Sequence, residues 1–234
     1  MRIHSCAPWM LCVTCLALLP LAQADDWPAP VVREVFSHSR AYFVRVIPGK
    51  SFGDTVGFSG SAKGPFGTAE FYRLEKDRSY RLAATASLLN PVAPVEFFVT
   101  DRGLLITLDN WHNMGYGTIV AFYSPEGKTI RAYGLSDLFT QSEIDGFRHS
   151  VSSIWWRKSA GSYVRQGEDT FYVTVNDTGA GFVFDVGGGY QYCETKEGKY
   201  LCRNANRDRK WRAYSDSLFS RQHRQILDDQ RVRP

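Results

Sequence analysis

The stretch PVEFFVTDRGLLITLDNWHNMGYGTIVAFYSPEGKTIRAYGL, residues 94–135, decides the fold of this chain. It holds four short runs rich in β-branched and aromatic residues, the types that are enriched in β-strands. Asp101-Arg102-Gly103 supplies one turn, and the segment 124–128 supplies another with Pro125 and Gly127, which suit turn backbone angles. The predicted strands are 95–100, 104–108, 118–123 and 129–135.

Short connections between consecutive strands predict antiparallel neighbours, so this unit is a four-stranded meander. In this respect the unit resembles one blade of a β-propeller, although a β-sandwich uses the same pieces. The resemblance concerns architecture alone and implies no activity. The flanking sequence contains imperfect copies, and we place units near 31–89, 91–139 and 147–202 in a β-rich domain that spans 25–202.

About three units are fewer than the four to eight blades of a closed propeller. A degenerate fourth blade, an open array of sheets and a dimer all remain open at this point. We expect an all-β, antiparallel fold with one short helix at 141–147, where Thr140 and Glu143 match a capping box, and a second helix at 213–227. Further predicted strands are 41–47, 68–74, 80–87, 151–156, 170–175 and 181–186.

The amino terminus has the pattern of a signal peptide. Arg2 is followed by a mostly apolar run at 8–21 and by the small residues of Ala22-Gln23-Ala24, which predicts cleavage after residue 24. The apolar run is shorter than the roughly 20 residues that span a bilayer. We therefore expect a secreted or periplasmic protein with no transmembrane span in the mature chain; a retained amino-terminal anchor is the alternative.

Two cysteines, Cys193 and Cys202, remain after that cleavage, and in an oxidising compartment we expect a disulfide between them across a hairpin. The tail 203–234 is basic, with nine Lys/Arg against four Asp/Glu, and it accounts for the whole net charge of +4. Because export removes nucleic acid as a partner, we interpret this tail as a solvated face.

The candidate site is the loop between the second and third strands of the central unit. It brings together Asp109, Asn110, Trp111, His112 and Tyr116, a dense set of polar and aromatic groups. Such a loop suits the binding of an envelope or extracellular protein, a peptide or a glycan. The alternative without a ligand is that Asp109 and Asn110 bond backbone amides while Trp111 and Tyr116 cover the core.

No nucleophile motif, metal-ligand spacing or cofactor fingerprint is evident in the sequence, so we assign no catalytic residue, no metal and no cofactor. The prediction is a non-enzymatic binding or structural protein. The alternative is a hydrolase in which Asp109 orients His112 as a general base within a cleft formed by the loop.

Overall fold

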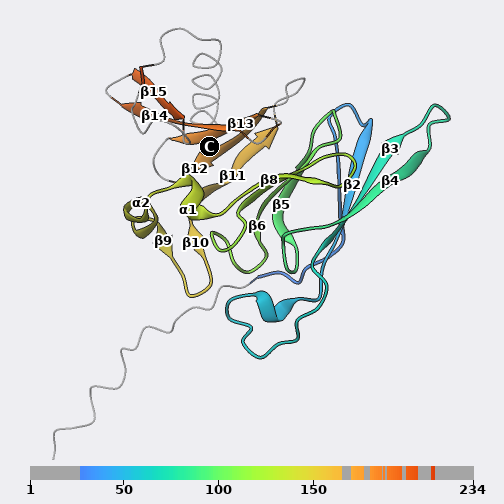
Figure 1. Cartoon of the computed structure of the whole chain (residues 1–234), viewed down its shortest axis with the longest axis horizontal. Helices are drawn as coiled ribbons and strands as arrows, with labels where there is room; N and C mark the ends of the chain where they lie inside the picture. Colours follow the sequence, from blue (N-terminus) through green and yellow to red (C-terminus); the bar gives the residue numbers. More distant parts are fainter. Residues whose placement is uncertain are drawn as a thin grey trace, which may run out of the picture.

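The computed structural model describes residues 27–164, 170–176, 180–185, 187, 189–196, 199–204 and 212–213. Within them the chain forms three larger antiparallel sheets and one two-stranded hairpin, and each larger sheet is a simple meander (Figure 1). The all-β fold class is therefore confirmed. The predicted signal peptide at 1–24, and all of 214–234, lie outside the described residues.

The first sheet comprises four strands in chain order, although the sequence showed only three of them clearly. Its strands are β1 (Arg33–Phe36), β2 (Tyr42–Ile47), β3 (Thr68–Leu74) and β4 (Tyr80–Ser87). Strand β1 escaped prediction because it is short. Between β2 and β3 the Gly-rich loop 48–67 contains a single 3-10 turn, η1 (Phe52–Asp54).

The central sheet is the predicted four-stranded unit. Its strands are β5 (Pro94–Val99), β6 (Leu105–Asn110), β7 (Val120–Tyr123) and β8 (Thr129–Tyr133), paired in that order. The main difference is that β6 continues through Asp109 and Asn110, which the sequence had placed in a loop. These two residues are buried, and main-chain pairing with Pro94 holds Asn110 in the sheet.

The third sheet continues the meander through strands that the sequence predicted in part. Its strands are β11 (Arg157–Val164), β12 (Thr170–Val175), β13 (Gly181–Asp185), β14 (Tyr190–Lys196), β15 (Lys199–Asn204) and β16 (Arg212–Ala213). Cys193 of β14 and Cys202 of β15 are direct partners in the register, as a disulfide across a hairpin requires. The proposed disulfide itself stays a prediction.

Two short α-helices, rather than one, join the central and third sheets in the described chain. Helix α2 (Gln141–Asp145) has the predicted capping box, in which Thr140 Oγ1 accepts from the Glu143 amide and Glu143 Oε2 accepts from the Thr140 amide. Helix α1 (Leu135–Leu138) was not predicted. Of the predicted helix at 213–227, only Ala213 is described, and it lies in β16 rather than in a helix.

A small hairpin follows α2, where the sequence predicted one strand over 151–156. The structure has β9 (Arg148–His149) paired with β10 (Ile154–Trp155) instead. Val151 lies in the connecting turn and is 85% exposed, so the first part of the predicted strand is turn and only Ile154–Trp155 forms a strand. None of the helices among the described residues has the length and apolarity needed to cross a membrane.

The central sheet is covered on both faces, which fixes the architecture (Figure 1). On β6, Ile106 and Leu108 belong to a core shared with the third sheet and the helices, whereas Leu105 belongs to a core shared with the first sheet. Alternate residues of β7 divide in the same way. Because successive side chains of a strand point to opposite faces, a sheet buried on both faces shows a continuous apolar run rather than alternation.

Candidate functional site

Asp109 lies at the end of β6 and is fully buried, with its backbone in the left-handed region at φ 53°. Its Oδ1 accepts hydrogen bonds from Trp156 Nε1 at 2.7 Å and from the Gly115 amide at 3.0 Å. Its Oδ2 accepts from Arg157 Nε at 2.6 Å in an ion pair whose two side chains are 0% and 1% exposed. The carboxylate thus joins the central sheet to the start of the third.

Two asparagines next to Asp109 close the loop that follows β6. Asn90 Nδ2 donates to the Asp109 carbonyl at 3.0 Å and to Asn110 Oδ1 at 2.8 Å. Asn110 Nδ2 in turn donates to the carbonyl of Tyr116 at 2.7 Å. Because all these groups are buried or partly buried, the amides satisfy loop backbone atoms that water would otherwise solvate. Asn110 therefore has a positioning role in the loop.

A third asparagine, Asn113, fastens this loop to two other segments. Its Oδ1 accepts from the Val56 amide in the Gly-rich loop at 2.7 Å, and its Nδ2 donates to the Ser152 carbonyl in the β9–β10 hairpin at 3.1 Å. The sequence gave Asn113 no separate role, because its partners lie 57 and 39 residues away.

Trp111 and His112 are partly exposed and belong to a group of packed aromatic rings, which we call the rim cluster. Its members come from the amino-terminal lead-in, the Gly-rich loop and the loop after β6: Trp27, Phe52, Phe58, Trp111 and His112. Phe58 packs edge-on against the His112 ring at 4.8 Å between centroids, and Phe52 packs edge-on against Trp111 at 5.6 Å. Trp111 Nε1 donates to the Pro28 carbonyl at 2.9 Å.

The imidazole of His112 has an unusual environment within this cluster. Its Nδ1 is shielded from solvent and has no hydrogen-bond partner among the described residues. A Cβ built on Gly57 would lie 3.4 Å from His112 Cε1, so the glycine backbone passes closely over the ring. His112 adopts a positive φ of 65°, which is uncommon outside glycine. This backbone conformation is strained, and such strain often occurs at functional sites.

The structure therefore separates the predicted site residues. Trp111 and His112 lie in the rim cluster, Asp109 and Asn110 are engaged beneath it, and Tyr116 packs against the core shared with the third sheet. The sequence did not reveal Phe52, Phe58 and Trp27 as members. For Phe52 and Phe58 the only signal was their place in a Gly-rich loop, and such a signal does not say which other loop they contact.

The adjacent tryptophans at the end of β10, Trp155 in the strand and Trp156 just after it, differ in burial. Trp156 is 0% exposed and donates to Asp109, whereas Trp155 is half-buried. In the described part of the chain, no group of three or more His, Cys, Asp or Glu residues is placed to hold a metal ion.

Comparisons add no family assignment, so the functional argument depends on the geometry alone. No family model matches the chain, and searches of the curated proteins and of the solved structures found no match either.

Proposed function

We propose that this chain is an exported, non-enzymatic binding protein whose ligand docks on the rim cluster. The single observation that carries the proposal is the shielded, unpartnered Nδ1 of His112 among four partly exposed aromatic rings. A buried polar atom without a partner costs free energy, on the order of 1–3 kcal/mol, and such costs concentrate at binding sites. A ligand that displaces the covering loop at Gly57 and reaches Nδ1 would remove this cost.

The ligand chemistry follows from the rings. Partly exposed aromatic faces bind apolar side chains or the apolar faces of sugars, and the imidazole adds one directional hydrogen bond. This agrees with the predicted ligand classes: an envelope or extracellular protein, a peptide or a glycan.

The geometry favours binding over hydrolysis. A general base needs an orienting partner within hydrogen-bond reach, and Asp109 was the candidate. Its carboxylate instead accepts from Trp156, Gly115 and Arg157, so it is not free to orient His112. No observation specifically supports the hydrolase alternative.

Export and the disulfide belong to the same proposal. The amino-terminal pattern supports secretion, and the direct register of Cys193 with Cys202 supports a bond that forms only in an oxidising compartment. Intact-mass analysis of protein purified from the periplasm and from the medium tests both points. A mature chain that retains residues 1–24, or that carries two free thiols, would contradict them.

The decisive test is a variant with Trp111→Ala and His112→Asn, because asparagine tolerates the positive φ at position 112. Trp155→Ala is the matched control, since it removes a half-buried tryptophan outside the rim cluster. Wild type and both variants are compared on a glycan array and in quantitative pull-downs from envelope extracts, after their melting temperatures are measured. Removal of a central aromatic anchor costs about 2 kcal/mol or more, which corresponds to a loss of roughly 30-fold.

We expect that loss in the rim variant and near-normal binding in the control. Equal recovery of every glycan and protein by all three proteins would refute the proposal.

A further inference from the structure

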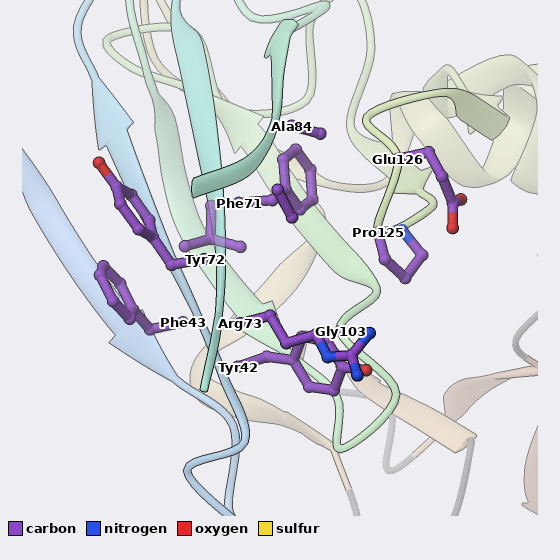
Figure 2. Close-up of a pocket in the computed structure, with 11 residues that line it drawn as sticks. Tyr42, Phe43, Phe71, Tyr72, Arg73, Ala84, Gly103, Pro125 and Glu126 are labelled. Carbon is purple, nitrogen blue, oxygen red and sulfur yellow. The ribbon is translucent and has the colours of Figure 1, made fainter. Parts of the chain in front are cut away.

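A cavity of about 260 Å³ lies between the first sheet and the turns of the central sheet, far along the strands from the rim cluster. Figure 2 shows Phe71, Arg73 and Tyr42 on the side of the first sheet that faces Pro125, Glu126 and Gly103. Phe43 and Tyr72 project from the opposite side of that sheet and contribute only at its margin.

The floor of this cavity is apolar and well ordered by packing. Val44 and Phe71 are 1% and 3% exposed and belong to the core shared by the first and central sheets. Ala84 of β4 leaves the space above them unfilled because its side chain is a single methyl group. One wall is fixed by Gly103, since a Cβ built there would lie 2.6 Å from the ring of Tyr42.

Two arginines stand at the tip of the first sheet beside this cavity. Arg73 lines it, and Arg81 is the direct cross-strand partner of Arg73 in the β3–β4 register. Directly opposed residues project from the same face of a sheet with Cβ atoms about 4.5–5.5 Å apart, and like charges there are destabilising. Neither guanidinium forms a salt bridge with another described residue.

Two nearby acids offset this positive charge only in part, because neither forms an ion pair with Arg73 or Arg81 in the described chain. Asp77, in the same hairpin, interacts electrostatically with Arg81, and its carboxylate also accepts hydrogen bonds from the Ser79 amide and hydroxyl at 3.0 and 2.7 Å. Glu126 lies across the cavity from Arg73, where its hydrogen bond with Ser124 and the nearby charge of Lys128 lower its pKa.

We propose that the cavity binds a small carboxylate with a bulky apolar body, with the carboxylate bridging Arg73 and Arg81 and the body lying over Phe71 and Ala84. A bridging anion removes the repulsion between the two guanidinium groups, and Arg is suited to carboxylates through its planar fork of donors. The volume is below the roughly 300–1,000 Å³ of pockets for drug-sized ligands, so it suits one ring on a short chain. The same chemistry occurs in a free aryl-alkanoate and in the carboxyl terminus of a peptide that ends in phenylalanine.

The probes separate the contribution of the apolar ring from that of the carboxylate charge, and a free carboxylate from the end of a peptide. The ¹⁵N-labelled protein is titrated with 3-phenylpropanoate, with the neutral 3-phenylpropan-1-ol, with acetate, and with a tetrapeptide that has a free carboxyl-terminal phenylalanine. We expect saturable shifts at β3, β4 and the turn 124–127 with the first probe, and at least threefold weaker binding of the alcohol and of acetate. Tighter binding of 3-phenylpropanoate would indicate a free aryl-alkanoate as the ligand, and tighter binding of the tetrapeptide would indicate a peptide carboxyl terminus.

Protein variants test the same site, and each is paired with a control substitution outside the cavity. Arg73→Gln and Arg81→Gln should each weaken 3-phenylpropanoate at least threefold, while Arg131→Gln, an exposed arginine on β8, should not. Ala84→Leu should weaken binding by filling the cavity, whereas Thr85→Leu on the other face of β4 should leave it unchanged.

Three outcomes would overturn the inference: no saturable shift at β3 and β4, acetate binding as tightly as 3-phenylpropanoate, or equal binding by all variants. The second outcome would show an adventitious anion site only. The Trp111→Ala, His112→Asn variant should bind 3-phenylpropanoate like wild type, so a failure at the rim cluster and a failure at this cavity are distinguishable.

Discussion

Replacing Asp109 by asparagine should destabilise the whole fold, although the change is isosteric. The substitution keeps the side-chain shape, and asparagine tolerates the left-handed backbone at this position. It removes the negative charge that Arg157 contacts at 2.6 Å, while Arg157 stays buried with Glu96 Oε2 at 3.0 Å as its remaining acidic partner. Because the Glu96 side chain is 32% exposed, it compensates a buried guanidinium only in part.

The expected cost is about 3–5 kcal/mol, the range seen when one partner of a buried ion pair is removed. This is a large share of the roughly 5–15 kcal/mol by which proteins of this kind are stable. With a urea m-value of about 1–3 kcal/mol per molar, the unfolding midpoint should fall by about 1–5 M.

Urea unfolding followed by tryptophan fluorescence suits this test, because Trp156 donates directly to Asp109. Glu34→Gln is the matched control: it removes the carboxylate of the Arg45–Glu34 pair, whose side chains are 38% and 40% exposed. Exposed pairs contribute about 0–1 kcal/mol, so the control should unfold almost as wild type does. A loss of unfolding free energy below about 1 kcal/mol for Asp109→Asn would show that the buried Asp109–Arg157 ion pair is not important for stability.

Two further predictions concern the central sheet and its loop. Burial raises the pKa of Tyr123, so the stability that this phenol contributes is complete below the unfolded pKa of about 10 and is lost as the pH rises through the folded pKa. Between about pH 9.5 and 11.5, Tyr123→Phe should therefore lose less stability than wild type in urea titrations. An equal fall of stability with pH in the two proteins would contradict this. Gly115→Ala should destabilise by about 2 kcal/mol or more, because φ is +78° and the new Cβ would lie 2.7 Å from the Ile154 carbonyl oxygen; a melting temperature within 2 °C of wild type would count against it.

The strands were predictable where local patterning alone decides them. Strands β3, β4 and β12 have the predicted bounds, because alternation and turn residues mark both of their ends. Strand β1 is four residues long and half-exposed, so it leaves no such signal. The predicted strand at 151–156 begins in the turn between β9 and β10, and only the three-dimensional structure shows that Val151 lies in that turn.

For the candidate site, the sequence identified an unusual loop but not how its residues divide their roles. An aspartate that follows a strand-like run reads as a loop residue, and nothing near it in the sequence indicates that Arg157 will approach it from 48 residues away. The rim cluster likewise combines residues from three separate segments, with Trp27 the most distant from Trp111 and His112. Local sequence identifies an unusual loop, whereas the partners of that loop are set by how the sheets stack.

Because the central sheet is covered on both faces, the three large sheets are stacked in a row, and each outer sheet is stabilised through its interface with the central one. The two cores are separate clusters, and each is shared only by neighbouring sheets. Stability is then close to a sum of nearest-neighbour interface contributions, as in stacked-repeat proteins. An outer sheet can detach in a sub-global opening while the other interface persists, so amide protons of β6 and β7 should exchange last, after those of the margins.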